Sequence, residues 1–63
     1  MTEERKNQIR KLDDENGVYG VTCESFASIL KEEGFSRAEV EEYYLDDPEF
    51  IKMAKLDRVF DGE

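Results

Sequence analysis

Cys23 is the residue of this sequence whose side chain is the strongest candidate nucleophile. Nucleophilic catalysis needs a base beside the attacking group, and histidine, the usual base, is absent from all 63 positions. Carboxylate pairs can also transfer protons, but a chain of this length has little room for a substrate pocket. We therefore expect a protein that is not an enzyme, with Cys23 as a small buried residue of modest reactivity.

Metal binding and disulfide formation are the other chemistries that these residue types suggest. Cys23 has no second cysteine and no histidine to join it, which excludes a disulfide or a Cys/His zinc site within one chain. The acidic run Asp13–Gly17 is similar to part of a calcium loop, in which a glycine occupies the sixth position. That register would place Leu12 first and Cys23 twelfth, where aspartate and glutamate are needed. We expect a solvated turn here, with no metal and no cofactor.

The net charge of −8 is unevenly distributed along the chain. Residues 1–12 carry four basic and two acidic side chains, residues 13–51 carry two basic and twelve acidic ones, and residues 52–63 carry three of each. The acidic middle would repel the phosphates of nucleic acids and of anionic lipids. We therefore expect neither direct nucleic-acid binding nor membrane binding. No long apolar run and no apolar stretch after Met1 occur, which predicts a cytoplasmic protein.

Apolar residues at three- and four-residue spacing predict an all-α fold. Thr2 can cap a first helix that runs to about Leu12 and ends near Asp13, where carboxylates would oppose the negative end of the helix dipole. Thr22 is a natural N-cap for a second helix. Four apolar residues recur on one face of that helix: Cys23, Phe26, Ile29 and Leu30.

The second predicted helix ends, and a third begins, at the run Gly34-Phe35-Ser36. Gly34 suits the left-handed residue that follows a helix, with Phe35 placed to contact the last turn as a Schellman motif requires. Ser36 and Glu39 have the spacing of a capping box, which marks a helix start. We expect a helix-turn-helix-like junction at these residues.

A third helix is predicted from Arg37 to about Leu45, and a fourth from Pro48 to about Phe60, because proline starts a helix well and disfavours one before it. A broad apolar face is expected on the fourth helix from Phe50, Met53, Ala54, Leu56 and Phe60. Such a helix lies in the centre of a bundle or contacts another chain. We expect one all-α domain over residues 1–63, a small bundle of three to four short helices.

Residues 26–53 resemble two three-helix families. The resemblance to the DNA-binding helix-turn-helix rests on Gly34, Phe35, Val40 and Tyr43. The resemblance to the ubiquitin-associated domain rests on residues 34–37, Gly-Phe-Ser-Arg. Leu30 departs from the first pattern, which has a small residue there, and Glu33 departs from the second, which has a hydrophobic one. Each resemblance covers less than half of the chain and implies a helical module that binds another macromolecule.

The acidic middle is the candidate binding surface. Carboxylates on two helices and their turns can imitate the phosphates of a nucleic acid and occupy a basic groove of a partner protein. Their mutual repulsion opposes folding, and a cationic partner would offset it. We therefore expect a binding protein that inhibits or modulates a basic, nucleic-acid-handling protein, as small phage-encoded nucleic-acid mimics do. The residues expected to bind the partner are Glu39, Glu41, Glu42, Asp46, Asp47 and Glu49, with Tyr19 as an aromatic anchor.

An alternative is a helical adaptor that binds through apolar surface. Phe35 in the junction would supply that surface together with Ile51 and Val59, which fall off the apolar face of the fourth helix. The same residues would also suit a homodimer. Binding through apolar surface changes little with ionic strength, whereas binding through carboxylates weakens steeply, so salt dependence distinguishes the two hypotheses.

Overall fold

The structure, a computed structural model, describes residues 1–17 and 20–61. It contains α1 (Glu3–Gly17), α2 (Cys23–Glu32), α3 (Arg37–Tyr43), α4 (Pro48–Ala54) and a π-helical turn, η1 (Asp57–Asp61). No strand occurs in these residues, which confirms the predicted all-α fold. None of the described helices is both long and apolar enough to cross a membrane.

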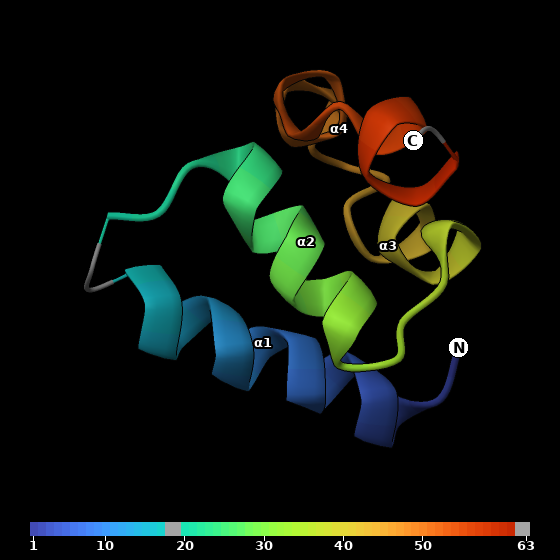
Figure 1. The fold of residues 1–63 in the computed structure, drawn as a ribbon. Coiled ribbons are helices and arrows are strands. Elements are labelled where there is room, and N and C mark those ends of the chain that lie inside the picture. The colour runs from blue at the N-terminus through green and yellow to red at the C-terminus, as the bar shows by residue number, and fades with distance from the viewer. Residues whose placement is uncertain (18–19, 62–63) are drawn as a thin grey trace.

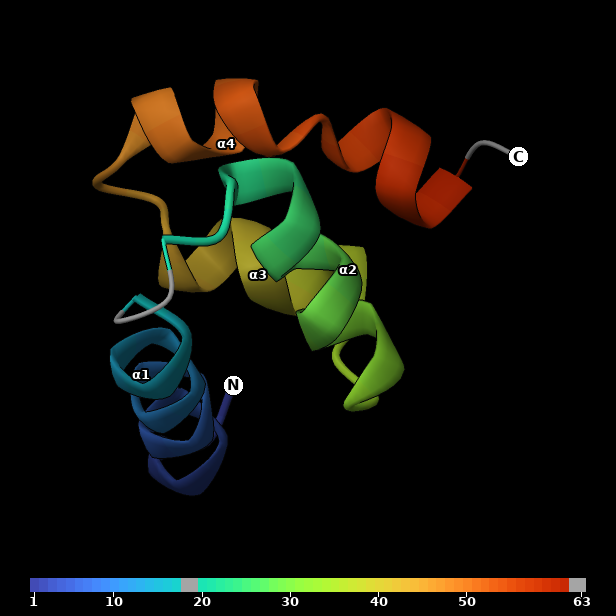
Figure 2. The same ribbon diagram turned by 60° about the vertical axis from the view of Figure 1, so that its left-hand side comes forward.

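α2 is the centre of the bundle. Figure 1 shows it crossing above α1, with α3, α4 and the C-terminal turn on its other side, and all four of these elements pack against it. Phe26, Ala27 and Leu30 are its buried residues. The rest of the core consists of Ile9, Phe35, Val40, Tyr44, Ala54 and Leu56. α4 does not occupy the centre but lies along one edge of the bundle (Figure 2).

α1 is longer than the sequence predicts. It was expected to end near Asp13, but it continues to Gly17. Ile9 is fully buried and holds the helix against the core. Asn16 Nδ2 donates a 2.8 Å hydrogen bond to the Leu12 carbonyl, which ties the side chain of the last turn back to the helix. Solvent screens the exposed carboxylates from the helix dipole, so the hydrogen bonds of the added turn outweigh that repulsion.

The turn between α2 and α3 has the predicted geometry. Gly34 is left-handed, with φ of 98°, and the Phe35 N–H donates to the Leu30 carbonyl at 3.0 Å, as in a Schellman motif. Ser36 Oγ then accepts a hydrogen bond from the Glu39 N–H, and the Glu39 carboxylate accepts one from the Ser36 N–H. The predicted helix stop and helix start are both confirmed.

The predicted fourth helix is broken. The sequence predicts one helix from Pro48 to about Phe60, but α4 ends at Ala54, and Lys55 is left-handed with φ of 54°. Ala54 and Leu56 are both buried. In a continuous α-helix, side chains two residues apart point about 200° apart and cannot both face one core. The left-handed Lys55 between them turns the chain so that both side chains reach the core.

This break also changes which residues of the last segment are exposed. Met53, expected on the apolar inner face, is 58% exposed. Ile51 and Val59, expected on the outer side, are half-buried and pack against the core. η1 packs on α2, and this new direction of the chain brings Val59 inward. Both expectations are therefore wrong, because they assumed a single straight helix.

Candidate binding surface

Glu39, one of the expected partner-binding residues, is already bound to a cation of its own chain. Its Oε2 accepts a 2.5 Å hydrogen bond from Arg5 Nε, and its Oε1 accepts a 3.0 Å bond from Arg5 Nη2. These bonds, followed by the one from the Ser36 N–H, lower the pKa of Glu39 to about 2. Because its side chain is only 23% exposed, this carboxylate joins α1 to α3 and is poorly placed to bind a partner.

Glu41 and Glu42 also form ion pairs within the chain. Arg37 Nε lies 3.1 Å from Glu41 Oε2, one helical turn away, and the amino group of Met1 lies 3.4 Å from Glu42 Oε2. The two carboxylates keep side-chain exposures of 44% and 51%. Exposed ion pairs contribute little to stability, so an external cation can compete for them, but each charge is already partly balanced.

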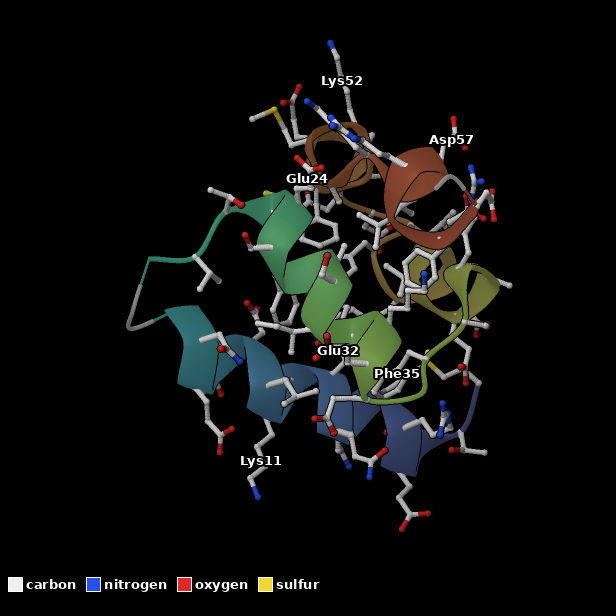
Figure 3. The ribbon with its side chains drawn as sticks, in the orientation of Figure 1. Lys11, Glu24, Glu32, Phe35, Lys52 and Asp57 are labelled. Carbon is white, nitrogen blue, oxygen red and sulfur yellow. The ribbon has the colours of Figure 1, made fainter. Side chains whose placement is uncertain are left out.

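Arg37 is the anchor of the C-terminal turn. Besides Glu41, its guanidinium binds Asp57 at 2.6 Å and Asp61. The hydrogen bond to Glu41 and then those to Asp57 and Asp61 raise the pKa of Arg37 above its ordinary value. Asp57, labelled in Figure 3, projects from η1 at the side of the bundle. The acids of η1 therefore already share a cation of their own chain.

The three remaining carboxylates predicted to bind a partner are exposed at the turn before α4 and in its first turn. Asp47 is the N-cap of α4, and its Oδ1 accepts a 3.2 Å hydrogen bond from the Phe50 N–H. Asp46 and Glu49 form no ion pair with any residue that the structure describes. These three carboxylates can contact a partner without first losing a cation of their own chain.

Tyr44 packs against the start of α4. Its ring is buried and stacks on Phe50 with 3.8 Å between ring centroids, and its hydroxyl has no hydrogen-bond partner among the described residues. Burial raises the pKa of Tyr44, and the carboxylates of Asp13 on α1 and Asp47 at α4 raise it further. Carboxylates of two elements therefore both act electrostatically on this hydroxyl. We define the acidic face as Asp13, Asp46, Asp47 and Glu49.

Asp13 is the member of the acidic face that sequence reasoning missed. The sequence suggested only a solvated turn at this residue, whereas the structure places it in the last part of α1. Its electrostatic effect on Tyr44 couples residues 31 positions apart, and no local pattern in a sequence signals such a coupling. The prediction for Tyr19 falls outside the described residues.

The apolar contact surface of the alternative hypothesis is not formed as expected. Phe35 is only 4% exposed, and the Arg5 guanidinium covers its ring at 4.4 Å from the centroid. Ile51 and Val59 pack against the core. The side chains that the adaptor hypothesis requires at the surface therefore stabilise the fold instead.

No metal centre or nucleophile pair is assembled in the part of the chain that the structure describes. Residues 1–17 and 20–61 contain no group of three or more His, Cys, Asp or Glu side chains that could hold a metal ion. Cys23 is half-buried in the first turn of α2.

A pocket of about 260 Å³ lies between α1 and the α2–α3 turn, and its lining combines charged and apolar residues: Gln8, Lys11, Leu12, Glu15, Glu33 and Phe35.

The family resemblances of the α2–α3 turn gain no support from comparison with known proteins. The chain matches no protein family, no curated protein and no solved structure. The bonds that end α2 and begin α3 account for residues 34–36 without a family motif. The function of the chain is therefore inferred from the chemistry of its own surface.

Proposed function

We propose that this chain is a non-enzymatic binding protein that inhibits or modulates a basic, nucleic-acid-handling partner through its acidic face. The observation that carries the proposal is the separation of its carboxylates into two groups. One group is bound to cations of the chain itself. The other forms no ion pair among the described residues: Glu3, Glu4, Asp13, Asp14, Glu15, Glu32, Glu33, Asp46, Asp47 and Glu49.

The acidic face presents its charges from fixed positions. The stacking of Tyr44 on Phe50 and the capping bond of Asp47 hold the turn that carries them. Preorganised charges lose little conformational entropy on binding, and a negative surface speeds association with a positive one. Carboxylates also suit a groove that binds phosphates, because carboxylates and phosphates are both anions that accept hydrogen bonds. These properties support the imitation of a nucleic-acid backbone.

The test is affinity capture of basic proteins from the source cell's lysate at low and at physiological ionic strength. The bait is the full chain, beside a variant with Asp46→Lys and Glu49→Lys. We expect the wild-type chain to retain a basic protein at low salt, to release most of it as salt rises, and to reduce that protein's binding to nucleic acid. The reversed face should retain at least about tenfold less, since each lost charge pair weakens the complex.

A matched control is the variant with Glu3→Lys and Glu4→Lys, which changes the net charge by the same amount at the opposite end of α1. It should capture nearly as much as the wild-type chain, because its acidic face is intact. Equal loss in both variants would show that total charge rather than the acidic face binds. Capture that does not respond to salt would contradict the proposal.

A further inference from the structure

The most exposed large apolar side chains of the described residues lie near the two ends of one short segment. Leu45, just before α4, is 74% exposed, and Met53, near its end, is 58% exposed. α4 has seven residues, so about 10 Å of helix separates the two ends. Single exposed apolar residues are common on soluble proteins. The charges around these two decide whether they mark a contact.

The exposed charges of this segment are polarised along the chain. Asp46 and Glu49 lie at its start, Lys52 and Lys55 lie at its end, and all four are exposed. None of the four forms an ion pair with a described residue. Such a segment is complementary to a second copy of itself in antiparallel orientation. The register that sets Glu49 opposite Lys52 also sets Asp46 opposite Lys55, and two-fold symmetry forms each pair twice.

A groove beside the basic end has the chemistry to receive the apolar residue of the acidic end. It lies between the start of α2 and the end of α4, has a volume of about 480 Å³, and is lined by Thr22, Cys23, Glu24, Lys52, Met53 and Lys55. Its lining is mainly apolar, and Figure 3 shows Lys52 extending from α4 away from the bundle. Glu24 in the lining has its own cation, Arg58, at 3.9 Å.

We infer that the outer side of α4 is a homodimer interface, in which Leu45 of each copy enters the groove beside Met53 of the other. The α4 interface consists of Leu45, Asp46, Glu49, Lys52, Met53 and Lys55. An apolar groove with two lysines suits an apolar side chain that is followed by carboxylates. The chain itself carries such a sequence, which begins at Leu45. Because the donor and the groove lie at opposite ends of one helix, two copies satisfy both at once and the assembly closes.

The expected dimer is weak and electrostatic. Stable interfaces bury about 800 Å² on each partner, and one face of a seven-residue helix supplies less, in a chain whose whole accessible surface is 4461 Å². Small domains without disulfides or metals often gain stability by self-association. We therefore expect dissociation in the high micromolar range at low salt and at still higher concentration as salt screens the charges.

This inference goes beyond the proposed function and is tested separately from it. Asp46 and Glu49 belong to both surfaces, so a basic partner and a second copy exclude each other at α4. Reversal of Lys52 and Lys55 removes the dimer and leaves every carboxylate of the acidic face in place. The self-association experiment contains no partner, so its failure leaves the binding proposal standing, and a failed capture leaves the dimer standing.

The experiment is sedimentation equilibrium of the full chain from about 10 μM to about 1 mM at low salt, the range in which weak interfaces associate. The average mass of the wild-type chain should rise from one copy toward two. Two variants reverse the charges of one end each: Asp46→Lys with Glu49→Lys, and Lys52→Glu with Lys55→Glu. Each should dissociate at least about tenfold more readily, since like charges then face each other.

An equal mixture of the two variants supplies the decisive measurement. Every reversed residue of one variant then faces an opposite charge of the other, so the mixture should regain a dissociation constant within about threefold of the wild-type value. Unfolded variants could not restore one another, which separates a lost interface from a lost fold. Matched controls are Glu3→Lys with Glu4→Lys and Lys6→Glu with Lys11→Glu, which should dimerise like the wild-type chain. Any of three results would overturn the inference. The wild-type chain keeps the mass of one copy at every concentration, the mixture stays monomeric, or the controls lose the dimer.

Discussion

Arg5 and Glu39, 34 residues apart in the sequence, form an ion pair with two hydrogen bonds that joins α1 to the start of α3. The same guanidinium lies 4.4 Å from the centroid of the Phe35 ring and donates a 3.1 Å hydrogen bond to the Gly34 carbonyl. One side chain thus contacts the capping box, the helix-ending glycine and the aromatic residue between them. Arg5 is the main polar contact between α1 and the α2–α3 turn.

Replacement of this arginine should loosen α1. Arg5→Ala removes the ion pair, the ring contact and the carbonyl hydrogen bond together, and we expect its thermal unfolding midpoint to fall by roughly 5 °C. Arg5→Lys should lose part of this stability, because lysine lacks the planar guanidinium that donates two parallel hydrogen bonds. Arg10→Ala, on the same helix at an exposed position without an ion pair to any described residue, is the control and should change the midpoint little. A similar fall in both alanine variants would contradict the role of Arg5.

The Glu39 carboxylate makes stability depend on pH. Its pKa is about 2 in the folded chain against 4.5 for the free group, so the folded state favours the ionised form. The stabilisation is fully present above pH 4.5 and is lost as pH falls toward 2. In Glu39→Gln the side chain can still accept the Ser36 N–H but carries no charge. The stability difference between the two proteins, measured by urea unfolding, should be constant near neutrality and should shrink between about pH 4.5 and 2. A difference that persists at pH 2 would refute this assignment.

Two glycines should respond to alanine in opposite ways. Gly34 has φ of 98°, and a Cβ at this position would meet no atom within 4 Å. The cost of Gly34→Ala is therefore backbone strain, about 1–2 kcal/mol. Gly17 ends α1 without a positive φ and with equal space for a Cβ, so Gly17→Ala should stabilise by up to about 1 kcal/mol. Urea unfolding of both variants measures these changes in stability. A loss of stability at both sites would mean that space for the Cβ, not φ, determines the effect.

Lys55 stores strain that glycine would relieve. Its φ of 54° is the only positive φ of a non-glycine residue among those described, and glycine adopts this conformation at no steric cost. Lys55→Gly should therefore stabilise the chain by about 1 kcal/mol. Lys52→Gly, inside α4, should destabilise it by about as much, because glycine disfavours helix interiors. Chemical denaturation below the concentration of self-association gives both values. Destabilisation by Lys55→Gly would show that the lysine side chain itself holds this turn.

The starts of α2, α3 and α4 and the end of α2 were predictable from the sequence, because the bonds that make them are local. Thr22 accepts from the Ser25 N–H, Ser36 and Glu39 bond each other, and Asp47 accepts from the Phe50 N–H. In each case the two groups lie three residues apart. Side-chain type at a fixed short spacing is information that a sequence contains directly.

The acidity of the middle segment and the all-α class were likewise properties of the sequence, but the availability of each carboxylate was not. Glu39, Glu41 and Glu42 resemble Asp46 and Glu49 in type and neighbourhood, yet only the first three have cations beside them. Two of these cations, Arg5 and the amino group of Met1, come from a distant segment, whereas Arg37 lies one helical turn before Glu41. The break at Lys55 also comes from packing, since burial of Ala54 and Leu56 in one core outweighs the continuation of a helix. Local hydrogen bonding set the starts of α2, α3 and α4, whereas burial and contacts between distant segments ended α4 and decided which residues remain exposed to bind.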